Sequence, residues 1–202
     1  MRSGHFATLR ELTTGESGSV VQHLLCSLPN LEKFRAAKIH ISDIHRDGRP
    51  WLCKGMKTLD LFFVLEIEPP TLSSTPEFEG FSSLLEFPSL LDQQYQILDR
   101  LAELTQLQTL DIGCRPGEAF DTYSLKLRVS HGLNKLGSLK RIATPGHEHT
   151  KQQLQEEDVH WMLSHWPWFE RKQGLSNEDP AVEKQLNWIF RQADVVSRSA
   201  DA

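Results

Sequence analysis

The chain has 202 residues, 39% of them hydrophobic, and a formal net charge of -5. This length and composition are sufficient for a folded unit with a proper core and exclude a chain that is disordered throughout. The acidic balance, with no stretch that concentrates lysine and arginine, gives no indication of nucleic-acid binding.

The sequence also limits the cellular compartment. The longest uninterrupted apolar run, residues 61–65, is far shorter than the roughly 20 residues that cross a bilayer. The first residues contain no apolar stretch that resembles a secretory signal. Cys26, Cys53 and Cys114 are too few for a disulfide framework and are expected to be reduced core thiols. We expect a cytoplasmic protein, with the nucleus as the alternative, and no membrane partner.

The first half of the chain alternates between helical and extended patterns. We interpret residues 1–19 as an N-terminal extension. A helical apolar face over residues 21–28 ends at Pro29, and residues 41–50 are expected to form a polar loop. Residues 59–67 alternate as a strand does, and residues 68–91, which are rich in proline and serine, are interpreted as an insertion.

The second half begins with a helical pattern over residues 94–104, which leads into the most regular stretch. In residues 101–113, LAELTQLQTLDIG, leucines are spaced first by three and then by two. This change predicts a helix end, a turn and a short strand. The same unit fits at five places, and its anchor residues are Leu31, Met56, Leu107, Leu139 and Phe169.

Repetition of such a unit is typical of a leucine-rich-repeat solenoid. We therefore predict an α/β fold of about five irregular repeats over residues 20–178, arranged as a partial horseshoe. Leu125, Leu127 and Val129 alternate as a strand would. Asp179 and Pro180 predict the start of a last helix, so residues 179–202 are expected to form a helical C-terminal cap and tail.

Residues between the anchors would face outward from the predicted strands and form a surface for a protein partner. The candidate partner-binding residues are Arg35, Asp60, Gln108, Thr109, Asp111, Arg141, Trp168 and Arg171. Aspartates at the centre and arginines at the flanks are consistent with a binding footprint and equally with an ordinary solvated face. Trp161 and Trp166 are expected in the core, and Trp168 is expected to be exposed.

Two clusters could be taken for metal sites. Asp43, His45 and Asp47 have the spacing of a calcium loop, but Lys54 stands where that loop requires glutamate. The histidines 147, 149, 160 and 165 include no helical pair four residues apart. We predict no catalytic, cofactor or metal site. A metal-dependent or hydrolytic enzyme using residues 147–165 is the alternative.

Five phrases carry a family resemblance: HLLCSLPNLEKFRA, RPWLCKGMKTLDL, LAELTQLQTLDIG, GLNKLGSLKRI and EEDVHWMLSHWPWFERKQG. They resemble the C-terminal, leucine-rich-repeat part of fungal F-box/LRR-type proteins. The resemblance implies substrate recognition for a Cullin-RING ubiquitin ligase, in which a separate F-box binds a Skp1-like adaptor. This sequence contains no F-box-like segment, so the adaptor would bind only a longer form.

The repeats also depart from that family's pattern. The usual ladder positions after the strands hold Ile39, Val64, Arg115 and His147 in place of asparagine or cysteine. We expect a non-enzymatic protein-interaction module with no cofactor and an unidentified protein target. A degenerate scaffold fragment without independent activity is a further alternative.

Overall fold

The computed structural model describes residues 8–66, 89–112, 125–145, 153–169, 177 and 179–200, with side chains described as far as residue 192. The elements, in chain order, are β1 (Glu11–Thr13), α1 (Ser19–Ser27), β2 (Lys33–His40), α2 (Ile41–Asp47), β3 (Thr58–Val64), α3 (Leu90–Ala102), β4 (Thr109–Asp111), the 3-10 helices η2 (Val129–His131) and η3 (Leu133–Ser138), β5 (Thr144–Pro145), α4 (Glu156–His165) and α5 (Pro180–Ala200).

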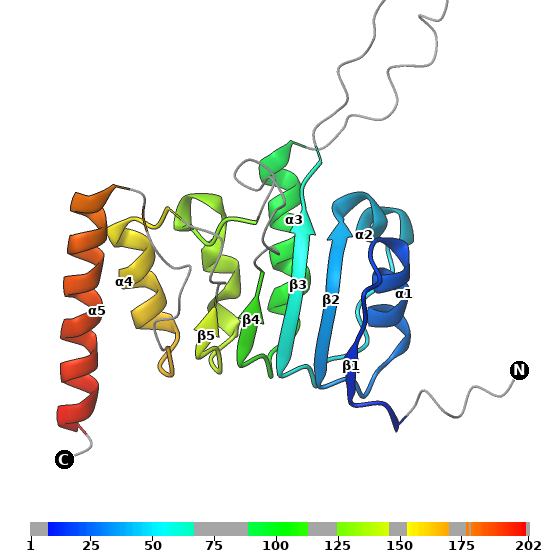
Figure 1. Ribbon diagram of the computed structural model, residues 1–202, viewed down its shortest axis with the longest axis horizontal. Coiled ribbons are helices and arrows are strands. Elements are labelled where there is room, and N and C mark those ends of the chain that lie inside the picture. The colour runs from blue at the N-terminus through cyan, green and yellow to red at the C-terminus, as the bar shows by residue number, and fades with distance from the viewer. Residues whose placement is uncertain are drawn as a thin grey trace, which may run out of the picture.

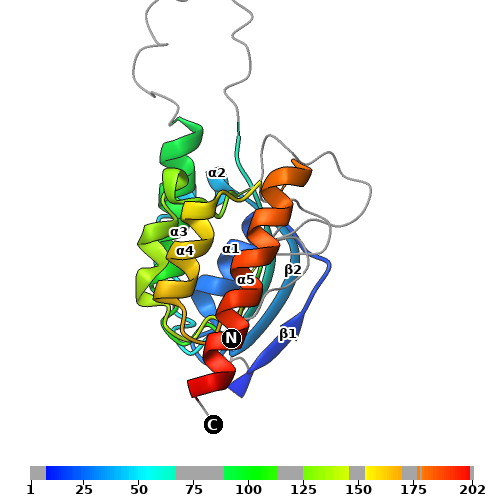
Figure 2. The same cartoon turned by 90° about the vertical axis from the view of Figure 1, so that its left-hand side faces the viewer.

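The five strands form one parallel sheet in the order β1-β2-β3-β4-β5. Figure 1 shows them side by side, with α4 and α5 beyond β5 at the end of the molecule opposite β1. A quarter turn away, α1 and α3 lie on one side of the sheet (Figure 2). The described helices between the strands therefore leave the other face of the sheet uncovered.

Backbone hydrogen bonds set the register where the strands begin. The carbonyl directly before each of β1, β2 and β3 accepts two N–H groups from the start of the next strand. The carbonyl of Arg10 accepts from Glu32 and Lys33, that of Glu32 from Lys57 and Thr58, and that of Lys57 from Gln108 and Thr109, at 2.7 to 3.0 Å. This arrangement aligns equivalent side chains of successive strands.

The core lies between the sheet and the helices. Phe34, Leu59 and Leu110 form a buried row across β2, β3 and β4. Trp51 is fully buried and stacks on Phe63, with ring centroids 6.4 Å apart. Its indole N–H donates to Gln22 Oε1 at 2.9 Å, which provides the polar partner that a buried tryptophan needs.

The helices predicted from apolar stripes are present. α3 begins earlier than expected, at Leu90, because the Ser89 hydroxyl accepts a hydrogen bond from the Asp92 N–H at 3.1 Å and caps the helix. Asp179 caps α5 as predicted, since its Oδ1 accepts from the Ala181 N–H at 2.8 Å. The stripe of α5 is buried through Leu186, Ile189 and Phe190.

The prediction of a leucine-rich-repeat solenoid is wrong. The structure is α/β, but it is a small parallel sheet whose strands range from two residues in β5 to eight in β2. Its connections also differ in kind, since α2 follows β2 whereas η2 and η3 precede β5. The expected anchor Phe169 lies in no strand. The spacing of leucines indicates which side chains are buried, but the length of a strand depends on the strand that pairs with it. β3 continues to Val64 because β2 pairs with it as far as His40.

Three local predictions need correction as well. The predicted N-terminal extension contains β1, which pairs with β2. The loop expected at residues 41–50 contains α2, which buries Ile41 and Ile44 on one helical face. Residues 125–128 are not in a strand. The predicted insertion lies outside the described residues, apart from residues 89–91.

Candidate functional site

Two rows of polar side chains cross the face of the sheet that the described helices leave uncovered. They include the residues directly before and after Phe34, Leu59 and Leu110 in the strands. Because side chains alternate along a strand, both rows lie on the face of the sheet opposite the buried row. In register, one row is Glu11, Lys33, Thr58 and Thr109, and the other is Thr13, Arg35, Asp60 and Asp111. We call these eight residues the polar sheet face. Phe62 points to the same side but is only 7% exposed, and the four members of the rows on β3 and β4 are half-buried. The exposed part of the polar sheet face is therefore on β1 and β2.

Ion pairs link the strands within the polar sheet face. Lys33 Nζ lies 2.8 Å from Glu11 Oε1, and the Glu11 carboxylate raises the pKa of Lys33 by accepting its hydrogen bond. Arg35 Nε donates to Asp60 Oδ2, and the side chain of Arg35 is 63% exposed whereas that of Asp60 is 22% exposed. The two cations therefore lean in opposite directions, one toward β1 and the other toward β3.

A hollow of about 180 Å³ lies over β1, β2 and β3. All six members of the polar sheet face on these strands line it, together with Leu12 and Phe34. Thr13 and Thr58 are the short side chains of this block. The lining therefore offers cations, carboxylates and hydroxyls to a ligand within one small area.

A second ionic cluster borders the strand starts. Glu32 binds Arg10 Nη1 at 2.9 Å and Lys57 Nζ at 2.5 Å through its two carboxylate oxygens. The hydrogen bond from Lys57 is the main reason that the pKa of Glu32 lies below its ordinary value, and the charges of Lys57 and Arg10 act in the same direction. This cluster extends the charged surface beyond the two rows.

A register shift in β2 brings all of its basic side chains to one side. The shift lies between Arg35 and Lys38. Residues of β2 that oppose Thr58, Asp60, Phe62 or Val64 share the side of the polar sheet face. Those residues are Lys33, Arg35, Lys38 and His40. His40 Nδ1 lies 3.2 Å from Glu66 Oε1, which also accepts from the Ser42 hydroxyl at 2.8 Å.

The chain was compared with protein-family models, with curated proteins and with solved structures, and none of the three comparisons found a match.

None of the described helices is long and apolar enough to cross a membrane.

The structure brings together only part of the predicted partner-binding surface. Arg35, Asp60, Thr109 and Asp111 belong to the polar sheet face, and Asp60 and Asp111 are register neighbours. Gln108 is exposed directly before β4, and Arg141 is exposed in the turn before β5.

The remaining predicted residues lie elsewhere. Trp168 is 69% exposed, as predicted, and follows α4. Trp166 is buried as expected, whereas Trp161 is only partly buried. Arg171 lies outside the described residues.

Sequence reasoning missed Glu11, Thr13, Lys38 and His40. The only sign of β1 is the three-residue alternation of Glu11, Leu12 and Thr13, which is too short to predict a strand. Lys38 and His40 were missed because uninterrupted alternation from Lys33 places them on the core side. The register shift that reverses their direction has no signature in the sequence.

The clusters considered for metal binding have other contacts. Asp47 accepts from Arg49 Nη2 at 2.9 Å, and this hydrogen-bonded guanidinium keeps the pKa of Asp47 below its ordinary value. His165 stacks on Trp161 with ring centroids 4.3 Å apart, and His160 lies 3.3 Å from Glu156. Within the described part of the chain, no group of three or more histidine, cysteine or acidic side chains could hold a metal ion. Residues 147 and 149 lie outside that part.

Proposed function

We propose that this protein is a non-catalytic protein-binding module and that the polar sheet face contacts its partner. The observation that carries the proposal is the pair of polar rows on one face of an all-parallel sheet, which are exposed on β1 and β2 and half-buried on β3 and β4. Sheets of this type are normally covered on both faces by helices and are then apolar on both. A face that is charged and accessible on such a sheet is suited to contact another molecule.

The chemistry of the face favours a protein partner. Its cations and carboxylates alternate within one small area, which suits the mixed charges of a protein surface and opposes a uniformly charged polyanion. The Lys33–Glu11 pair is exposed on both sides, and exposed ion pairs contribute only about 0–1 kcal/mol. A carboxylate of a partner can therefore replace Glu11 at little cost to the stability of the fold.

Proximity labelling in cells tests the proposal with a charge-reversed face. The test variant is Asp60→Arg with Asp111→Arg, and the control is Asp99→Arg with Glu103→Arg. The control makes the same change in charge at two other exposed acids. Asp99 lies in α3 and pairs with Lys135, and Glu103 lies directly after α3 and pairs with Lys54. We expect the test variant to lose partners that the wild type and the control keep. Identical partner sets for all three proteins, each with the same melting temperature, would show that this face is not the binding surface.

On the sequence resemblance alone, we propose a more specific role for the same module, which is recognition of a protein substrate for a Cullin-RING ubiquitin ligase. Any link to a Skp1-like adaptor would require an F-box in a longer form of the protein. Co-purification of the full-length protein with that adaptor tests this role. If a protein target binds but no ligase component co-purifies, the proposed binding function stands and the proposed role in a ubiquitin ligase is contradicted.

A further inference from the structure

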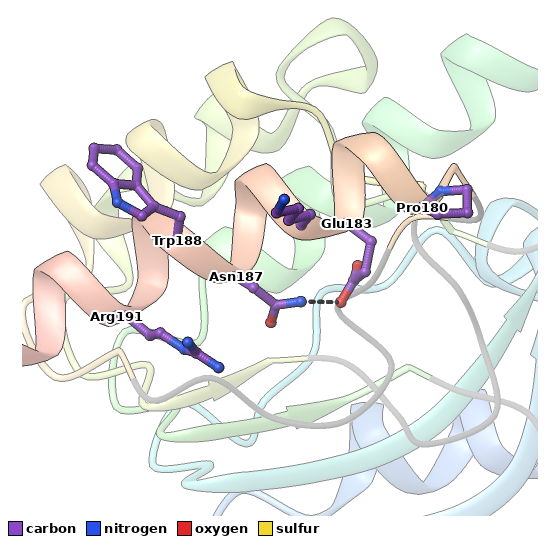
Figure 3. A pocket seen from close by; sticks show the side chains of 6 residues that line it. Pro180, Glu183, Asn187, Trp188 and Arg191 are labelled. Atoms are coloured by element: carbon purple, nitrogen blue, oxygen red, sulfur yellow. Dashed lines mark hydrogen bonds between the residues drawn. The ribbon is translucent and has the colours of Figure 1, made fainter.

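The outer side of α5 carries a stripe of side chains that the core does not use. Trp188 is 62% exposed, and both Lys184 and Arg191 are exposed. A hollow of about 510 Å³ is lined by Pro180, Glu183, Lys184, Asn187, Trp188 and Arg191, and these six residues are here called the α5 outer stripe. Figure 3 shows their side chains projecting from the helix, with Pro180 at one end and Arg191 at the other.

The packing of α5 does not account for Trp188. The helix buries Leu186, Ile189 and Phe190 on its inner side, and the Phe190 ring stacks on Phe169 with centroids 5.6 Å apart. Two residues along a helix correspond to a rotation of about 200°, so Trp188 lies roughly opposite Phe190. Within the described part of the chain, the Trp188 indole has no hydrogen bond and no ring contact. Tryptophan is among the residues that most often act as anchors at protein interfaces.

Two cations accompany Trp188. Lys184 precedes it by four residues and Arg191 follows it by three, which places them about 40° and 60° from it around the helix. The one acid of the stripe, Glu183, is already engaged: Oε2 accepts from the Asn177 N–H at 2.9 Å and Oε1 from Asn187 Nδ2 at 3.1 Å. Glu183 also lies five residues before Trp188, about 140° around the helix. The charged side chains of the stripe nearest the indole are therefore the cations Lys184 and Arg191, in a chain whose net charge is -5.

We propose that the α5 outer stripe is a second docking surface, and that its occupant is an acidic amphipathic segment of another protein. Apolar side chains of that segment would cover Trp188, and its carboxylates would pair with Lys184 and Arg191. Tryptophan and arginine are the residues that most often dominate binding energy at protein interfaces. This surface is separate from the polar sheet face and does not depend on the function proposed for it.

Charge disfavours the other occupants. In a two-fold antiparallel pair of α5 helices, Lys184 would face Arg191 of the second copy, which brings like charges together. Two cations are too few for a nucleic-acid site. A membrane surface is disfavoured because the apolar stripe of α5 is buried in the protein's own core, which leaves a single aromatic ring outside.

Fluorescence anisotropy with defined peptides tests the proposal on the full chain. The probe is a labelled helical peptide of about 14 residues, with leucine at helical spacing and glutamate elsewhere, and its control has lysine in place of glutamate. We expect the glutamate peptide to bind and the lysine peptide not to bind. Raising the salt concentration from about 50 to about 500 mM should weaken the binding, because the ionic contacts are exposed.

Variants locate the binding. Trp188→Ala, and separately Lys184→Glu with Arg191→Glu, should each weaken binding of the glutamate peptide by about tenfold or more. Trp168→Ala, which removes another exposed indole, and Lys33→Glu with Arg35→Glu, which reverses cations of the polar sheet face, should leave it unchanged. Circular dichroism verifies that every variant is folded. The proposal is overturned if the glutamate peptide does not bind, if the lysine peptide binds equally well, or if the α5 variants bind like the wild type.

Discussion

Gln93 binds the backbone of Glu66 through both polar atoms of its side-chain amide. Its Oε1 accepts from the Glu66 N–H at 2.8 Å, and its Nε2 donates to the Glu66 carbonyl at 2.7 Å. The neighbouring Gln94 binds the N–H of Lys126 at 3.0 Å and its carbonyl at 3.1 Å in the same way. Both glutamines are buried in α3. Their side-chain amides therefore hydrogen-bond the backbone of two separate chain segments in the way that a neighbouring strand would.

Replacement of Gln93 by glutamate tests this role. The side chain keeps its shape, but the carboxylate cannot donate to the Glu66 carbonyl and places a charge in a buried position. We expect a loss of about 2–4 kcal/mol in the free energy of unfolding, measured with urea. Gln96→Glu is the control, since Gln96 is on the same helix, is only half-buried and has no hydrogen bond within the described part of the chain. Equal stability of the two variants would contradict the role.

Gly132 is a position where a side chain should not be tolerated. Its φ of +93° favours glycine, and a Cβ there would lie 2.4 Å from Tyr95 Cε1. We expect Gly132→Ala to lower the free energy of unfolding by about 3 kcal/mol, from backbone strain together with the steric clash. Adding Tyr95→Ala should remove the clash, so the alanine at 132 should then cost only about 1 kcal/mol.

Gly55→Ala is the matched control for Gly132, because a Cβ at Gly55 would meet nothing within 4 Å. Thermal and urea unfolding should place this variant within about 0.5 kcal/mol of the wild type. A Gly132→Ala protein as stable as the Gly55→Ala protein would mean that α3 and the turn at residue 132 are not in the contact described.

The buried thiols should be unreactive in the native protein. Burial raises the pKa of Cys53 to about 12, and burial is also the main cause of the raised pKa of Cys26. Because the thiolate is the reactive form, alkylation of these thiols at any pH from 7 to 9 should be far slower than alkylation of a free cysteine. In a Cys114→Ser background, we expect both thiols to react only after unfolding in urea. Rapid labelling of either native thiol, followed by mass spectrometry, would contradict their burial.

The carboxyl group of Glu32 should titrate at an unusually low pH. Its pKa is lower in the folded than in the unfolded state, so its contribution to stability is present above the unfolded pKa and is lost as the pH falls through the folded value. An NMR titration of the Glu32 side chain should show this low midpoint. Lys57→Met should raise the midpoint more than Arg10→Met, because the hydrogen bond from Lys57 is the largest cause of the shift. The reverse order would contradict the assignment.

The local sequence determined which side chains are buried and where several elements begin. Leu59, Leu61 and Phe63 alternate into the core, Leu98 and Leu101 line the buried side of α3, and Asp179 starts α5. These features follow from apolar spacing and capping, which act over one or two turns of chain and can be recognised in the sequence.

Tertiary structure alone decided how the strands pair and what their polar side chains face. β1 exists because β2 offers it a partner, and β3 is long because β2 accompanies it to His40. The register shift turns Lys38 toward the side of the polar sheet face. The side chain of Gln93 hydrogen-bonds the Glu66 backbone where a neighbouring strand would otherwise do so. Each of these outcomes depends on hydrogen bonds between residues more than 20 positions apart. Leucine spacing predicts burial but contains no information about such partners, which is why it predicted a solenoid incorrectly.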